Sequence, residues 1–212
     1  MKTKSLFYLS LIGLLLYGCV AKKVTIKTYI NSSLNTSKIT SVAIFPLRNG
    51  FVQRDANLGT GDMIEINKVI HQEFSSMNPK ASLVTAVTSI DSLNKGNLVN
   101  SYDTLLRVYE YTGIPNTVIL NKIGKKLNVG AIIQGFVREI TQKDGVYGGN
   151  RGETRITLKY VMFSTNTGDV LWEATITGYK GTATTLAKAP PISDVIEIIK
   201  KKIITGMPKL SE

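Results

Sequence analysis

Cysteine and histidine, the side chains best suited to nucleophilic and metal-binding chemistry, each occur once in this sequence, as Cys19 and His71. Cys19 follows a basic start, residues 1–4 (MKTK), and an apolar run over residues 6–17. A basic segment, a short apolar segment and small residues before a cut make up a secretory signal. Because the apolar run is shorter than the roughly 20 residues that cross a bilayer core, we expect residues 1–18 to be cleaved as a signal peptide.

The segment Leu16-Tyr17-Gly18-Cys19 resembles the lipobox of bacterial lipoproteins, in which the cysteine becomes the acylated first residue. Tyr17 departs from the pattern, since a small residue is usual there. The alternative is an ordinary signal peptide next to an unrelated cysteine. The single cysteine at the right spacing favours the lipoprotein, so we predict lipidation of Cys19 by palmitate-type chains that hold the protein on a membrane. Residue 20 is Val, not the Asp that retains many known lipoproteins in the inner membrane. The resemblance therefore implies the periplasmic face of the outer membrane in a Gram-negative host.

One cysteine and one histidine restrict the remaining chemistry. No disulfide can form, so the core alone must stabilise the fold. Zinc and transition-metal sites draw mainly on cysteine and histidine ligands, and we predict no metal and no cofactor. His71 lies well off the apolar stripe of its predicted helix. A surface histidine is the simpler interpretation than a catalytic base, because an activated nucleophile needs partners at hydrogen-bond distance.

Other catalytic patterns are incomplete. The Gly-x-Ser-x-Gly elbow of hydrolases is absent. Gly59-Thr60-Gly61 could present backbone amides to an anion, but it lacks the full phosphate-binding spacing and its lysine, which favours a flexible entry loop. The acidic residues near predicted hairpin ends form no evident acid–base couple; they are Glu139, Asp144, Glu153 and Asp169. We therefore predict that the protein is not an enzyme.

The formal net charge is +11, which points to an anionic partner or to a soluble basic surface. A basic balance raises nucleic acid as a partner, but the predicted compartment and the lack of a nucleic-acid motif argue for no nucleic acid. Anionic lipid head groups, an acidic envelope polymer or an envelope protein fit better. The alternative, that excess lysine only keeps the surface soluble, stays open.

Residues 19–37 are predicted to be the lipidated cysteine and a tether, followed by a single domain over residues 38–208. Within the tether, Lys22, Lys23 and Lys27 are candidates for contact with anionic head groups, and residues 24–29 could form an edge strand.

In the domain, apolar patterns predict a buried strand over residues 39–47, a helix over 62–77 and a short strand over 82–87. Helices follow within 90–128, one capped by Ser101 and closed by Gly113, the next opened by Pro115-Asn116.

Alternating apolar residues predict an antiparallel meander over residues 131–141, 153–164 and 169–179, with Trp172 on the buried face. A last helix begins at Asp194 with Ser193 as its cap. The resulting order, β-α-β-α-α-β-β-β-α, predicts an α/β (α+β) domain: a mixed sheet with helices packed on it.

Three segments carry a family resemblance: residues 41–47 (SVAIFPL), 127–135 (LNVGAIIQG) and 166–172 (NTGDVLW). They resemble the family that includes the curli-secretion lipoprotein CsgG, the lipoprotein activators of penicillin-binding proteins and the N-terminal domain of the translocation protein TolB. The resemblance covers roughly residues 38–207 and implies an anticodon-binding-domain-like fold. The motifs are strand ends and turns, so they indicate a fold and not an activity.

What the resemblance implies is a non-enzymatic accessory or assembly factor for an envelope machine, in secretion, cell-wall synthesis or a trans-envelope complex. An oligomeric channel subunit like the curli exporter is the alternative. The links over 141–153 and 180–193 are too short for the membrane hairpins of that exporter, which disfavours it, although a homo-oligomer is left open. The first link supplies a candidate partner-binding loop, which could equally consist of hairpin turn residues: Gly145, Tyr147, Gly148, Gly149, Asn150 and Arg151.

Overall fold

Seven strands form one mixed sheet, and five helices pack on it, in a computed structural model that describes residues 20–32, 39–50, 58–203 and 206–210. The strands are β1 (Lys22–Ile30), β2 (Ser41–Ile44), β3 (Arg48–Asn49), β4 (Ser82–Val84), β5 (Ala131–Lys143), β6 (Glu153–Ser164) and β7 (Val170–Gly181). The helices are α2 (Thr60–Met77), α3 (Ala86–Lys95), α4 (Val99–Thr112), α5 (Thr117–Leu127) and α6 (Ile192–Lys200).

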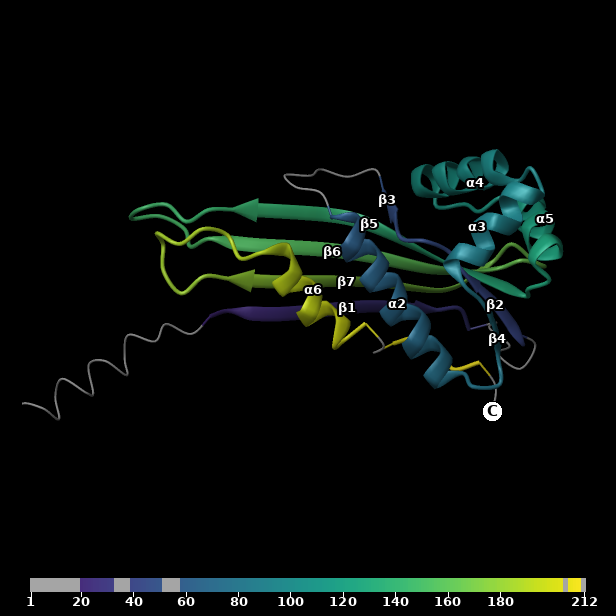
Figure 1. The fold of residues 1–212 in the computed structure, drawn as a ribbon, viewed down its shortest axis with the longest axis horizontal. Helices are drawn as coiled ribbons and strands as arrows, with labels where there is room; N and C mark the ends of the chain where they lie inside the picture. Colours follow the sequence, from purple (N-terminus) through teal and green to yellow (C-terminus); the bar gives the residue numbers. More distant parts are fainter. Residues whose placement is uncertain (1–19, 33–38, 51–57, 204–205, 211–212) are drawn as a thin grey trace, which may run out of the picture.

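The sheet has the order β1-β7-β6-β5-β2-β4, with the short β3 also paired to β5. β5, β6, β7 and β1 pair with one another in antiparallel fashion, whereas β2 and β3 pair in parallel with β5, and β4 pairs in parallel with β2. The long antiparallel strands run to one end of the molecule, and α3, α4, α5, β2 and β4 gather at the other end (Figure 1). The predicted mixed sheet with helices packed on it is confirmed.

Two apolar cores lie on opposite faces of the sheet. The first, the α2/α6 core, includes Ile66, Phe74 and Ile199 packed on β5, β6 and β7. The second, the α3–α5 core, includes Leu105 and Ile123 packed on β2 and on the first half of β5. The first half of β5 is consequently buried on both faces, while its second half alternates in exposure. The half of the sheet far from α3–α5 therefore has one face open.

A β-bulge keeps β5 in phase with its neighbour. Val137 pairs with Leu158, and the next pair is Glu139 with Thr157, so Arg138 is the extra residue. A bulge inserts one residue into one strand only and shifts the alternation beyond it. As a result Ile140, which pairs with Ile156, faces the α2/α6 core on the same side as Val137.

The structure adds β3 and a separate helix α3 to the predicted elements, and it includes as β1 the possible edge strand that the predicted order left out. The strand predicted to reach residue 87 ends at Val84, because Thr85 caps α3 by accepting a hydrogen bond at Oγ1 from the Thr88 backbone amide (3.3 Å). The predicted cap Ser101 lies inside α4, which begins at Val99 after Leu98. Likewise Ser193 lies inside α6, which begins after Pro191.

Two helix boundaries match the prediction. Gly113 ends α4 with a φ of 72°, a left-handed conformation that favours glycine. Asn116 caps α5 by accepting a hydrogen bond at Oδ1 from the Ile119 amide (3.1 Å).

The predicted tether requires a correction, because residues 22–30 belong to the sheet. Lys22 to Ile30 pair without interruption along β7, from Lys180 to Trp172. Val24 and Ile26 pack against the α2/α6 core. The backbone groups on the edge of β7 need hydrogen-bond partners, and β1 supplies them. The folded part thus begins before residue 38, while the predicted edge strand over 24–29 is confirmed.

Candidate functional site

A crevice opens where β2 and β4 end. The two strands are adjacent and parallel, and the chain leaves their carboxyl ends toward opposite faces of the sheet. After β2 it leads to α2, in the α2/α6 core, and after β4 it enters α3, whose Leu93 belongs to the α3–α5 core. In open sheets with parallel strands, this divergence creates a crevice outside the carboxyl ends, which is where ligands bind.

Local sequence explains the divergence. Pro46, two residues after β2, cannot donate a ladder hydrogen bond. The Leu47 amide instead donates to Asn67 Oδ1 (3.0 Å), which ties the exit of β2 to α2. On the other side, the Thr85 cap turns the chain into α3 immediately after β4, and Ser89 Oγ donates to the Ile44 carbonyl (3.5 Å).

The crevice, which we call the α2/α3 groove, has a volume of about 640 Å³. Its apolar lining includes two side chains that are mostly exposed, Ile64 (62%) and Val87 (73%). Lys68 and His71 lie on the α2 wall and Asp91 on the α3 wall. The full lining is Ile44, Pro46, Ile64, Asn67, Lys68, His71, Gln72, Thr85, Ala86, Val87, Ile90 and Asp91. Such a groove suits an apolar group flanked by polar contacts.

His71 differs from its predicted place. The sequence indicated a surface residue, but the side chain is half-buried in the groove wall, and its Nε2 atom is buried with no hydrogen-bond partner among the residues that the structure describes. A buried polar atom without a partner costs free energy. A ligand that donates to or accepts from Nε2 would remove that cost.

The sequence analysis missed this groove. Two apolar residues hinted at a surface that a ligand could cover. Ile64 lies outside the predicted apolar stripe of α2, and Val87 lies in the first turn of α3. Neither residue type reveals a groove unless one knows that α2 and α3 leave adjacent strands toward opposite faces.

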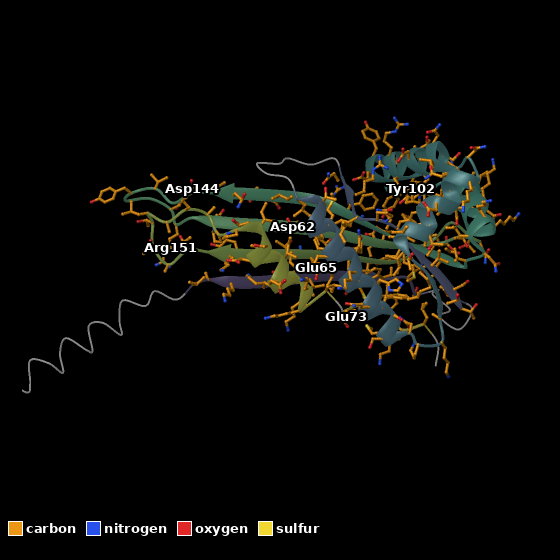
Figure 2. The ribbon with its side chains drawn as sticks, in the orientation of Figure 1. Asp62, Glu65, Glu73, Tyr102, Asp144 and Arg151 are labelled. Carbon is orange, nitrogen blue, oxygen red and sulfur yellow. The ribbon has the colours of Figure 1, made fainter. Side chains whose placement is uncertain are left out.

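The candidate loop lies at the far end of the molecule from α3–α5. It joins β5 to β6, and Asp144 and Arg151 mark it at the tip in Figure 2, opposite Tyr102. Tyr147 is 83% exposed. The loop and the groove are therefore separate places. Cys19 lies outside the described residues.

The backbone of the loop requires its glycines, as expected from the alternative interpretation that they are hairpin turn residues. A Cβ on Gly145 would come within 2.2 Å of the Thr185 carbonyl oxygen, and one on Gly152 within 2.6 Å of the Ala187 carbonyl oxygen. Gly148 has a φ of 68°. Two of these glycines allow the loop to touch the β7–α6 link, and the third makes a turn.

The other side chains considered as candidate catalytic or anion-binding groups take part in structural contacts. The Asp62 carboxylate accepts a hydrogen bond from the Gly59 amide (3.3 Å) at the start of α2, which is where an anion would bind. On the face of the sheet that carries the α3–α5 core, Tyr109 donates to Glu173, which pairs with Lys159 (2.9 Å). Burial and this hydrogen bond raise the pKa of Tyr109. Within the described ranges, no three His, Cys, Asp or Glu residues lie together as a metal site would require.

Among the described residues, no helix combines the length and the apolarity needed to cross a membrane. At the level of sequence, no family model matches this chain, and no curated protein matches it either.

Solved structures are similar to this chain at low sequence identity. The lipoprotein GNA1162 from Neisseria meningitidis is 11% identical with a TM-score of 0.51, and the match covers 78% of this chain and 95% of that chain. The PelC dodecamer from Paraburkholderia phytofirmans is 12% identical, with a TM-score of 0.47 and coverage of 86% and 96%. The LpoB C-terminal domain from Salmonella enterica is 9% identical, with a TM-score of 0.41 and coverage of 68% and 84%. The first likeness shows a shared fold with a bacterial lipoprotein and no more than the fold.

Proposed function

We propose that this protein is a lipid-anchored, non-enzymatic accessory or assembly factor on the periplasmic face of the outer membrane, where its domain binds another envelope protein. The anchor part of the proposal rests on the lipobox ending at Cys19. The fold shared with a lipoprotein, and the motif resemblance to CsgG, the activators of penicillin-binding proteins and TolB, support the setting.

The α2/α3 groove is the observation that carries the binding role. Ile64 and Val87 expose 62% and 73% of their surface at its rim, which is unfavourable in water unless a partner covers them. Lys68 and Asp91, on opposite walls, can orient a polar segment of either sign. We assign the groove to an apolar segment of a protein partner.

The groove also lies far from the end of the sheet where β1 begins, three residues after Cys19. Ile44, at its floor, pairs with Ile133, ten residues before Lys143 at the end of β5. At about 3.3 Å per residue, that places the groove roughly 30 Å from the loop end of the sheet. A partner in the periplasm would find the groove unobstructed by the membrane.

Photo-crosslinking in the native cell tests the groove. A photoreactive residue at Val87 should give one discrete adduct, and Ile64→Lys should abolish it without changing the circular dichroism spectrum, because Ile64 is mostly exposed. The matched control is a photoreactive residue at Val118, which is 66% exposed on α5 and outside the groove. No adduct from Val87, or the same adduct from Val118, would contradict the proposal.

The adduct also separates the two function candidates. An accessory factor should crosslink to a different envelope protein, identified by mass spectrometry. An adduct of twice the mass of this chain would instead favour the oligomeric channel subunit.

Acylation tests the anchor independently. Cys19→Ser should block incorporation of radiolabelled palmitate and leave an uncleaved precursor. Normal labelling of that variant would exclude Cys19 as the acylated residue.

A further inference from the structure

Two loops form a single tip at the open end of the sheet. The β5–β6 loop and the β7–α6 link are joined by backbone hydrogen bonds, Gly145 N to Ala187 O (3.0 Å) and Thr182 N to Gly152 O (2.8 Å). The Asp144 carboxylate accepts a further bond from the Ala189 amide (2.8 Å). Hydrogen bonds between the two loops therefore hold the tip in a defined shape, with defined side-chain positions.

Three large apolar side chains are exposed on this tip. Val146 is 62% exposed, Tyr147 is 83% exposed and Leu186 is 68% exposed. They come from both loops, which the hydrogen bond between Gly145 and Ala187 holds together. Isolated exposed apolar residues are ordinary, but a cluster at the end of a long sheet is typical of an interaction surface.

Basic residues share this end of the sheet with the apolar cluster. Among the described residues here, the exposed cations are Lys22, Lys23, Lys143, Arg151, Arg155 and Lys188. The carboxylates nearby are Asp144, Glu153 and Asp194, of which Asp194 pairs with Lys180 and Asp144 accepts from Ala189. Apolar and aromatic side chains ringed by lysine and arginine suit the interface of an anionic bilayer.

The predicted anchor is next to this tip. Gly181 donates its amide to the Ala21 carbonyl (2.9 Å), so the chain is held at the tip from residue 21 onward. Cys19 is two residues earlier in the sequence, and each residue spans at most about 3.6 Å. A lipid on Cys19 would therefore start within about 7 Å of Ala21.

We propose that the tip is a membrane-docking surface: Val146, Tyr147 and Leu186 insert into the lipid interface while the surrounding cations bind anionic phosphate head groups. The inference rests on the proposed anchor at Cys19 and deepens it, because it fixes the orientation of the whole domain on the membrane. The candidate loop thereby receives a lipid partner, and a protein partner at the same loop becomes an outcome of the test.

A fluorescent label reports docking on the acylated full chain in vesicles of phosphatidylcholine, with or without phosphatidylglycerol. Because Cys19 is the only cysteine and its thiol would be acylated, Tyr147→Cys supplies one free thiol for an environment-sensitive dye. Tyr111→Cys on α4 is the matched control, since Tyr111 is 91% exposed at the other end of the molecule.

The Tyr147 dye should shift to shorter wavelength and be quenched by nitroxide-labelled lipids, more strongly with phosphatidylglycerol, whereas the Tyr111 dye should not respond. Equal responses from both dyes, or none, would overturn the proposal. A Tyr147 dye that responds only when envelope proteins are added would assign the tip to a protein partner and would also overturn it.

Charge reversal tests the cations. The combined variant Lys143→Glu, Arg151→Glu and Lys188→Glu should abolish the phosphatidylglycerol-dependent part of the quenching. Its control, with the same change in net charge on exposed residues away from the tip, is Lys80→Glu, Lys95→Glu and Lys125→Glu. Equal losses in the two variants would show an effect of net charge alone and contradict a defined surface.

Mass spectrometry of the same sample separates this inference from the anchor proposal. Acylated protein with an unresponsive Tyr147 dye overturns docking alone. If the protein proves unacylated, the labelling is repeated with Cys19→Ser so that the dye is only at position 147; a response to phosphatidylglycerol vesicles then supports docking and contradicts the anchor. Unacylated protein with an unresponsive dye overturns both.

Discussion

Trp172 is the side chain whose place the sequence predicted most directly. Its alternation within β7 predicted burial, and it is 1% exposed in the α2/α6 core. Its indole Nε1 also donates to the Gly206 carbonyl (2.6 Å), and this contact brings the chain after α6 against the sheet. The hydrogen bond could not be foreseen, because Gly206 is distant in sequence and lies outside any regular element.

Replacing Trp172 by alanine should lower the free energy of unfolding by about 3 to 5 kcal/mol, since it removes a large buried ring and leaves a cavity. Urea denaturation of the two proteins measures the difference. Trp172→Phe should cost less, because it keeps most of the ring and loses the donor to Gly206. A midpoint that hardly moves for Trp172→Ala would mean that the indole contributes little to the core.

Tyr160 carries a buried hydroxyl group that has no hydrogen-bond partner in the described part of the chain. An unsatisfied buried polar group costs about 1 to 3 kcal/mol, so Tyr160→Phe should raise the free energy of unfolding by about 1 kcal/mol. The matched control is Tyr102→Phe, which should lower it, because Tyr102 donates to the buried Gln134 side chain. Chemical denaturation distinguishes the two, and a loss of stability in Tyr160→Phe would refute this expectation.

The same tyrosines make the fold sensitive to alkali. Burial raises the pKa of Tyr102, Tyr109 and Tyr160, and the hydrogen bond to Glu173 adds to the shift at Tyr109. In the unfolded chain a tyrosine ionises near pH 10, so above that pH the unfolded state loses protons that the folded state keeps. Stability should be constant with respect to these groups below about pH 10 and fall above it. Tyrosinate absorbance should then rise together with loss of the circular dichroism signal; gradual ionisation near pH 10 in a folded protein would contradict this.

At the scale of elements, β1 decides where the folded part begins. A chain that starts at Lys38 would contain the whole domain predicted from the sequence, but it would lack β1 and expose the edge of β7. It would also lose the packing of Val24 and Ile26, which contribute up to about 1.5 to 3 kcal/mol each when fully buried. We expect it to be less stable by at least about 2 kcal/mol than a chain starting at Val20 and to self-associate through the uncovered edge. Urea denaturation and light scattering measure both effects, and equal stability of the two chains would show that β1 is dispensable.

Periodicity explains which elements the sequence revealed. β6 and β7 alternate cleanly because one of their faces is open over much of their length, whereas β3 has two residues and no period to detect. The helix limits at Gly113 and Asn116 followed from local chemistry, while Leu98 and Pro191 precede helices without a side-chain cap. The α2/α3 groove could not be predicted, because it depends on two non-local crossings of the sheet. The tip loop was found from its glycines, although its contact with the β7–α6 link was not.

At the scale of the whole molecule, the two ends of the sheet have different tasks in our proposals. The tip faces lipid and the α2/α3 groove faces the periplasm, on opposite halves of an elongated domain (Figure 1). This arrangement fits the periplasmic face of either membrane, and our proposal favours the outer one because residue 20 is Val and not the Asp that retains many lipoproteins in the inner membrane. In a Gram-negative cell, density-gradient fractionation should place the protein with outer-membrane markers, whereas Val20→Asp should move it toward inner-membrane fractions. Co-fractionation of the unaltered protein with the inner membrane would reject this location.

The hydrogen bond that holds Ala21 to Gly181 has a mechanical consequence. With the lipid on Cys19, the linker between the bilayer and the rigid sheet is very short. The domain therefore acts as a spacer of fixed length and does not move freely on a flexible tether. The length of β5 between Ile133 and Lys143 then sets the height of the groove above the lipid, roughly 30 Å. Only partners that present their apolar segment at that height are selected, and inserting flexible residues after Cys19 would abolish this selection while leaving the groove itself unchanged.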